Sequence, residues 1–278
     1  MKAWYRGKRY FYLIIVLYIF VFVLAGCSED GENGNSTSPI DQNLPATLHA
    51  ILCIADHESD IGEAGIVDMN SMNSWLNQIS QNTSMSLNRI VLKGTSRNLS
   101  QNALLNVIAT LPVESNDVIV FYYTGHGGAN EFLGGSKWPL MLFQNNELVD
   151  YAVISEVIKA KGARFVVTIA DCCNNYSFQA KSRALVPKGT SDGYQSLFLK
   201  QSGYIVMSAA SKGEFSLAGS DGGMFTNQFL SVFYANVSTD SPGWKTIMQQ
   251  ASQTLGAYES TGRLIIFHPQ YDLDVSSL

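Results

Sequence analysis

The sequence predicts an α/β domain built on a mainly parallel sheet with helices on both faces. From residue 48 onward, apolar runs of strand length alternate with amphipathic stretches of helix length, the pattern of βαβ units. The first five runs are mostly apolar, as in strands that are buried on both faces. The chain has 278 residues, of which 46% are hydrophobic and 15% charged, which suits one globular domain with appendages.

The elements are expected in a regular order. Strands are predicted at 48–55, 88–93, 117–123, 164–170, 203–209 and 263–267, and helices at 66–79, 100–110, 150–161, 223–236 and 242–257. Residues 178–201 are polar and lack a clear period, so they are predicted to form a long loop. A loop of this length inside a compact domain is usually functional or mobile.

Residues 1–26 have the features of a bacterial lipoprotein signal peptide. A basic segment precedes an unbroken apolar run at 10–24, which is short for a transmembrane span. The run ends in "LAGC" at 24–27, a small-residue cleavage site followed by cysteine that resembles the bacterial lipobox. The mature chain would begin at Cys27 and carry lipid on its sulfur. An ordinary signal peptide or a single membrane anchor is the alternative.

Residues 27–47 are predicted to be the lipidated cysteine and a flexible tether. They are rich in Ser, Asn, Gly and acidic residues and too poor in apolar residues to bury a core. Glu29 and Asp30, close behind Cys27, resemble the surface-export signal of Bacteroidetes lipoproteins. We therefore expect a protein of the bacterial cell envelope, lipid-anchored in the outer membrane, facing the periplasm or the surface, with its folded domain at 48–278.

The net charge and the cysteine content limit the functions that the sequence allows. The formal net charge of -5 gives no electrostatic support for nucleic-acid binding. If Cys27 is lipidated, an odd number of cysteines remains, which suggests a free reactive thiol rather than a disulfide framework. A bridge between the neighbours Cys172 and Cys173 would be strained. No C-x-x-C or H-x-x-x-H spacing occurs and the four histidines are scattered, so no metal site is predicted.

Reactive side chains follow the ends of three predicted strands. They lie in "CIADHESD" at 53–60, "YTGHGG" at 123–128 and "ADCCNN" at 170–175. Because the carboxyl ends of parallel strands meet at one rim of a sheet, an imidazole, two thiols and several acids are expected to come together.

This combination suits a cysteine hydrolase. A thiolate attacks a carbonyl carbon, and an imidazole can protonate the leaving amine. The backbone N–H of Gly127, next to His126, and that of the reactive cysteine could both donate to the oxyanion. The alternative is that His126 caps a glycine-rich turn and that the cysteines are small core residues. The glycine-rich loop matches neither of the common phosphate-binding patterns.

The two motifs resemble those of caspase-like cysteine peptidases, especially metacaspases. "YYTGHGG" is similar to their Tyr-Ser-Gly-His-Gly and "DCCNN" to their Asp-x-Cys-His-Ser, in the same order along the chain. The resemblance extends over about 48–269. It implies a caspase-hemoglobinase-like three-layer sandwich, with a mainly parallel six-stranded sheet and helices on both faces, that acts as a cysteine endopeptidase. A clostripain- or gingipain-like peptidase is an alternative within this class.

The resemblance also implies roles for individual residues. His126 takes the place of the family's histidine, and Cys173, rather than Cys172, takes that of the nucleophile. Gly127 and Cys173 would supply the oxyanion donors. The pocket for the residue before the scissile bond, P1, would be formed by four residues: Asp171, Asp56, Cys53 and Thr124. Asn174 and Asn175 stand where the family often has His-Ser, and the family's acidic calcium-binding segment is not recognisable. We therefore predict no cofactor and leave calcium dependence open.

Acidic residues around the first strand predict the specificity. Five acids follow this strand, and no Lys or Arg occurs between Arg9 and Arg89. A negative pocket favours Arg or Lys at P1 of a protein or peptide substrate and repels Asp. For Glu63 and Asp68, a solvated acidic loop is the simpler interpretation.

Basic residues also occur in the predicted loop after the cysteines. The segment at 179–193 carries Lys181, Arg183 and Lys188 and is predicted to be a site of self-cleavage, because exposed polar loops are preferred nicking sites. The rival to a peptidase is a non-catalytic surface lipoprotein of the same fold that acts as a binding or scaffold protein.

Overall fold

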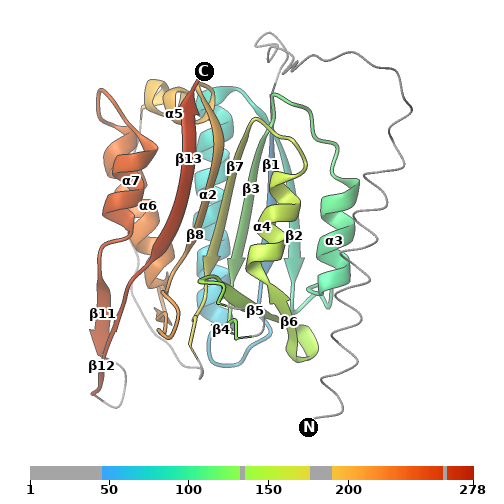
Figure 1. Ribbon diagram of the computed structural model, residues 1–278, viewed down its shortest axis with the longest axis vertical. Helices are drawn as coiled ribbons and strands as arrows, with labels where there is room; N and C mark the ends of the chain where they lie inside the picture. Colours follow the sequence, from blue (N-terminus) through green and yellow to red (C-terminus); the bar gives the residue numbers. More distant parts are fainter. Residues whose placement is uncertain (1–45, 132–134, 176–189, 259–261) are drawn as a thin grey trace. The chain divides into compact units, whose positions relative to one another are not determined.

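A computed structural model describes residues 46–131, 135–175, 190–258 and 262–278. At the centre of this part is a six-stranded sheet, formed by β1 (Thr47–Ile54), β2 (Ser86–Lys93), β3 (Val118–Thr124), β7 (Phe165–Asp171), β8 (Gln201–Ser208) and β13 (Gln270–Ser277). Their order is β13-β8-β7-β3-β1-β2 (Figure 1). All neighbours are parallel except β13, which runs antiparallel to β8. The mainly parallel six-stranded sheet is therefore confirmed.

Helices cover both faces of this sheet (Figure 1). One layer contains α2 (Gly62–Thr83), α5 (Ser191–Phe198), α6 (Met224–Val237) and α7 (Trp244–Ala251), whose apolar side chains share one core cluster. Trp75 of α2 packs edge-on against three phenylalanines of this layer. The other layer contains α3 (Gln101–Thr110) and α4 (Tyr151–Lys159), which belong to a second cluster. The predicted three-layer architecture is confirmed.

The apolar runs of the sequence follow from this layering. In β1, Leu52 and Ile54 point into the core under α2, whereas Ile51 and Cys53 point into the core under α3 and α4. Successive side chains of a strand point to opposite faces, so a strand covered on both faces needs apolar residues at every position.

The sixth strand differs from the prediction. The run at 263–267 forms β12 (Leu264–Phe267), which pairs with β11 (Leu255–Tyr258) in a hairpin outside the central sheet. The edge strand is β13, whose sequence "QYDLDVSS" is half solvated and therefore lacks a long apolar run. The helix expected at 242–257 ends at Ala251, and β11 occupies the end of that range.

The sequence did not predict several small elements near the ends of the strands. One is a three-stranded sheet of β4 (Gly127–Ala129), β5 (Pro139–Phe143) and β6 (Glu147–Asp150), with a single 3-10 turn η1 (Gln144–Asn146) between its last two strands. Another is the short pair of β9 (Ala218–Gly219) and β10 (Gly222–Gly223). The loop predicted at 178–201 is wrong from Ser191 onward, where α5 begins and buries Tyr194 and Phe198.

The predicted signal peptide, Cys27 and most of the tether lie outside the described residues. The same holds for Lys181, Arg183 and Lys188. Within the described ranges, no helix is both long enough and apolar enough to cross a membrane.

Candidate active site

The ends of β3 and β7 bring the histidine and cysteine turns together. In the register of these neighbours, Thr124 pairs with Asp171, so the two turns leave the sheet at the same level. Two backbone hydrogen bonds then join the turns, from Gly125 N–H to the carbonyl of Asp171 at 3.3 Å and from Ala129 N–H to the carbonyl of Asn175 at 3.0 Å. The juxtaposition expected from the strand ends is therefore present.

Gly127 is required for the close packing of these turns. A Cβ atom at this position would lie 2.6 Å from Sγ of Cys172 and 2.6 Å from the carbonyl oxygen of Cys173. Neither contact is compatible with a real side chain. The glycine after the histidine therefore has a packing role in addition to any role of its N–H group.

Tyr123 fixes the backbone of the histidine. Its hydroxyl is buried and lies 2.6 Å from the carbonyl oxygen of His126 and 2.8 Å from that of Leu142. The N–H of Leu142, in β5, donates to the same His126 carbonyl at 3.0 Å. The small β4-β5-β6 sheet thus holds the backbone of His126 in place.

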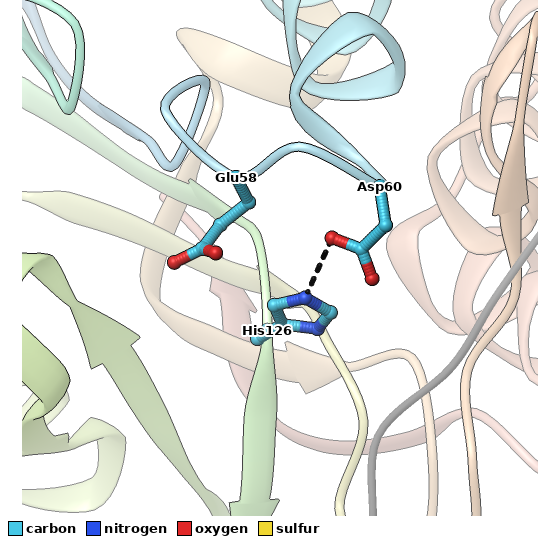
Figure 2. Close-up of side chains that lie close together, drawn as sticks. All are labelled: Glu58, Asp60 and His126. Carbon is cyan, nitrogen blue, oxygen red and sulfur yellow. Dashed lines mark hydrogen bonds and ion pairs between the residues drawn. The ribbon is translucent and has the colours of Figure 1, made fainter.

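The His126 side chain is 11% exposed and contacts an acid from the loop after β1. Its Nε2 lies 3.1 Å from Oδ1 of Asp60, whose side chain is 53% exposed, and the carboxylate of Glu58 lies nearby (Figure 2). The sequence marked Asp60 only as part of a negative pocket. Its contact with the histidine depends on the path of the 55–61 loop, for which the sequence carries no signal.

Cys173 is one of the residues that line a small pocket open to solvent. Its Sγ donates to the carbonyl of Ser216 at 3.4 Å and accepts from the N–H of Ser216 at 3.3 Å. The pocket is lined by residues 61, 64, 124–126, 171–173 and 216–218, so it contains both the histidine and the cysteine. Ser216 contributes from the loop after β8, and no sequence motif indicated it.

The surroundings of Cys172 do not favour its thiolate form. Burial raises the pKa of the Cys172 thiol well above its ordinary value, and the proximity of Cys173 and Asp171 raises it further. A thiol in such surroundings stays protonated near neutral pH and is a poor nucleophile.

Two buried carboxyl groups, those of Asp171 and Asp68, lie together next to this pocket. Asp171 accepts hydrogen bonds from the N–H and hydroxyl of Thr226 at 2.9 and 2.7 Å and from the Ser216 hydroxyl at 3.1 Å. Asp68 accepts from the Thr124 hydroxyl at 2.7 Å and from the Gly223 N–H at 2.8 Å. Burial, and then the charge of Asp171, raise the pKa of Asp68 to about 8, and burial also raises the pKa of Asp171.

Glycines let the backbone of β10 close over this acid pair. A Cβ at Gly222 would lie 2.3 Å from Oδ1 of Asp68, and one at Gly223 would lie 2.0 Å from Oδ2 of Asp171. The φ of +94° at Gly222 is itself a conformation that favours glycine.

Two of the residues predicted for the P1 pocket, Asp56 and Cys53, lie away from this pocket. The carboxylate of Asp56 accepts from the N–H and hydroxyl of Thr95 at 2.8 and 2.6 Å and lies 2.9 Å from the ammonium of Lys93. Neither Asp56 nor Cys53 is among the described residues that line the pocket. Cys53 is fully buried in the core under α3 and α4, and this burial raises the pKa of its thiol.

Asp68 takes the place next to Asp171 that was expected for Asp56. A signal for it exists in the sequence, because positions 68, 72, 75, 76 and 79 follow helical spacing and all five side chains of this stripe are buried. An acid on the apolar face of a helix is more informative than acids in the preceding loop.

Asn174, where the family often has histidine, has a structural role here. It is fully buried, donates from its side chain to the carbonyl of Lys137 at 2.7 Å, and donates its N–H to the carbonyl of Glu214 at 3.0 Å. The bond to Glu214 holds the loop after β8 against the cysteine turn, and the bond to Lys137 joins this turn to the segment before β5.

A three-layer α/β sandwich with a histidine and a cysteine on one pocket, at the ends of adjacent parallel strands, defines a caspase-like fold with a candidate thiol site. The chain matches the model of the caspase domain, Peptidase_C14, over residues 63–265, and it belongs to this family. Proteins of the caspase domain family are cysteine peptidases.

Among solved structures, the chain is similar to protein GSU0716 from Geobacter sulfurreducens. The two are 14% identical, with a TM-score of 0.50, and the match covers 81% of this chain and 92% of the other. This similarity shows the fold alone. A comparison with curated proteins gives no match.

Proposed function

We propose that this protein is a cysteine endopeptidase in which His126 and Cys173 form the catalytic dyad, and that it cleaves protein or peptide substrates after Arg or Lys. The observation that carries the proposal is the buried pair of Asp68 and Asp171 beside a pocket that contains both dyad residues. The intact dyad and acid pair favour an enzyme over a non-catalytic binding protein.

The proposed reaction assigns one step to each group. The Cys173 thiolate attacks the substrate carbonyl, and the N–H groups of Gly127 and Cys173 stabilise the oxyanion. The imidazolium of His126 protonates the leaving amine, and the neutral imidazole then takes a proton from the water that hydrolyses the acyl-enzyme. Asp60 orients the imidazole through Nε2.

The acid pair supports the specificity for basic residues. The hydrogen bonds that the described residues give Asp68 and Asp171 come from hydroxyl and backbone N–H groups, not from Lys or Arg. Two acids packed together repel each other in their ionised forms, so burial and repulsion favour a protonated form of the pair. An arriving cation offsets this repulsion and favours the ionised form of both acids. A guanidinium offers several donors in a fixed plane, which suits two neighbouring carboxylates.

Fluorogenic peptides that differ only at P1 test the proposal. We expect the purified protein to hydrolyse the Arg and Lys peptides and not the Asp peptide. Cys173→Ala should lose this activity and Cys172→Ala should keep most of it, because the buried Cys172 thiol stays protonated. A preference for Asp at P1 would contradict the pocket assignment, and an active Cys173→Ala would contradict the dyad.

We further propose, from the sequence alone, that the enzyme is lipid-anchored through Cys27 at the outer membrane and that it cleaves itself within 179–193. The basic residues of that segment match the specificity proposed for the acid pair.

A further inference from the structure

The imidazole of His126 has acidic neighbours that the proposed reaction uses only in part. Glu58 and Asp60 lie in the loop between β1 and α2. The Asp60 carboxylate points at the imidazole of His126, and the Glu58 carboxylate lies near them (Figure 2). Each of the three residues offers one possible ligand atom, and these three atoms all lie within 4.8 Å of one another. We propose that Glu58, Asp60 and His126 form a site for a divalent transition-metal cation, and that a bound cation inhibits the peptidase. The inhibitory part rests on the proposed function, whereas cation binding does not.

The donor set defines the chemical class of the ligand. An imidazole nitrogen together with two carboxylates suits Zn²⁺ and similar first-row cations better than Mg²⁺ or Ca²⁺, which take oxygen ligands. Two carboxylates also balance the charge of a divalent cation. Three protein ligands leave a fourth tetrahedral position for water, as in open zinc sites.

The loop that carries the two acids is held by its own backbone. The N–H of Gly62 donates to the carbonyl of Glu58 at 2.8 Å, and the N–H of Glu58 donates to that of Ala55 at 3.4 Å. A Cβ at Gly62 would lie 2.6 Å from the carbonyl oxygen of Asp56, so the chain turns tightly there. The Glu58 carboxylate also lies 3.2 Å from Nε2 of His57, which orients it.

Exposure lets a cation reach the site from solvent. The Glu58 and Asp60 side chains are 28% and 53% exposed, whereas that of His126 is mostly buried. The histidine therefore forms the inner side of the site and the acids form its outer side. Glu58 and Asp60 are two positions apart, but His126 is distant from both in sequence. The three residues therefore form no motif spacing, and the sequence predicted no metal site for this reason.

Occupation of this site is incompatible with the proposed role of His126. A cation on Nε2 replaces the hydrogen bond to Asp60, which orients the ring. An imidazole coordinated to the cation is no longer free to pass a proton between the leaving amine and the attacking water. Inhibition of this kind needs no contact with Cys173.

Isothermal titration with Zn²⁺ on the Cys173→Ala protein tests binding without any need for activity and without the Cys173 thiol as a ligand. We expect one Zn²⁺ per chain and loss of binding on addition of His126→Ala. Glu58→Gln and Asp60→Asn should each weaken binding at least as much as the loss of an outer-shell partner, about 10- to 100-fold. Glu63→Gln, which removes an exposed acid of α2 outside the cluster, is the matched control and should leave Kd unchanged.

The same acid variants in the active protein test inhibition. Wild type should lose activity over the range of Zn²⁺ concentrations in which the site fills, and it should recover activity when EDTA is added. Half-inhibition of Glu58→Gln should need at least about 10-fold more Zn²⁺ than half-inhibition of wild type. Absence of Zn²⁺ binding, or equal binding in the parent and both acid variants, overturns the site. Equal inhibition of wild type and Glu58→Gln places the inhibitory metal elsewhere. Binding to a protein that cleaves no peptide confirms the site and overturns the proposed function.

Discussion

At the scale of single residues, the acid pair of Asp68 and Asp171 is a source of both specificity and instability. Because the pKa of Asp68 is raised to about 8, the folded protein keeps a proton that the unfolded chain releases near pH 4. The free energy of unfolding should therefore fall as pH rises from about 4 to about 8. A buried acid retained at this cost is typical of a functional site.

The substitution Asp68→Asn should separate the two effects. The amide cannot ionise, so the variant should gain stability relative to wild type as pH rises from 5 to 8. A cationic P1 side chain favours the ionised form of Asp68, and an amide cannot supply that charge. The fall in kcat/KM for the Arg peptide should therefore correspond to about 2–5 kcal/mol of lost binding free energy. Thermal melts at several pH values and peptide kinetics measure the two effects. A stability difference that does not vary with pH would contradict the raised pKa.

Asp56→Ala is the contrasting substitution. Burial alone would raise the pKa of Asp56, but its bonds to Thr95 and Lys93 outweigh burial and lower it. We expect a loss of stability of about 1–3 kcal/mol from the broken hydrogen bonds, with no change in the preference for Arg at P1. A selective rise in KM for Arg peptides would contradict this expectation and indicate that Asp56 belongs to the P1 pocket.

At the scale of elements, the site depends on the fit between the turns after β3 and β7. Gly127 packs against Cys172 and the backbone of Cys173, and Tyr123 ties the His126 carbonyl to β5. The register of β3 and β7 determines where along the sheet the two turns begin. The contacts of Gly127 and Tyr123 determine how far apart the turns lie. A change of a few tenths of an ångström at Gly127 is thus passed directly to the dyad.

Gly127→Ala should abolish activity and lower the melting temperature, because its Cβ must push the cysteine turn away from the histidine. Overpacking of this kind typically costs about 1–3 kcal/mol. The control is Gly243→Ala, since a Cβ at Gly243 would meet no atom within 4 Å. It should alter stability by less than about 0.5 kcal/mol and leave activity intact. Full activity in Gly127→Ala would show that the packing is looser than the distances indicate.

At the scale of the whole molecule, the proposed specificity has a consequence for the enzyme itself. If it cleaves after Arg or Lys, it should cut its own chain after Lys181, Arg183 or Lys188, most readily after one of the first two. Intact mass spectrometry of wild type and Cys173→Ala, purified side by side, should show fragments only in wild type. Identical fragments in both proteins would mean that another protease trims the loop.

The predicted lipid on Cys27 determines where the molecule acts. Cys27→Ser should release the protein from membranes, because the lipid linked to that sulfur is its anchor. Labelling of cells with a fatty-acid analogue, followed by fractionation, measures both the modification and the location. Wild type that carries no label would contradict the lipoprotein prediction.

The parallel sheet, its helical layers and the meeting of His126 with the cysteine turn can all be predicted from the residue pattern. Strands buried on both faces must be apolar throughout, and parallel strands must end at one rim, so β3 and β7 are visible in the sequence together with the residues that follow them. The edge strand β13 cannot be recognised from the sequence in this way, because it is half solvated and has no long apolar run.

The acids that belong to the site cannot be recognised without the folded chain. Asp56, Asp60 and Asp68 are similar in a sequence read for charge, but the loop after β1 directs Asp56 to Lys93 and Asp60 to His126, and α2 directs Asp68 to Asp171. Strand periodicity determines the direction of a side chain only within a strand. Beyond the strand end, the path of the backbone depends on contacts between segments distant in sequence, so the partner of each acid is a property of the folded chain.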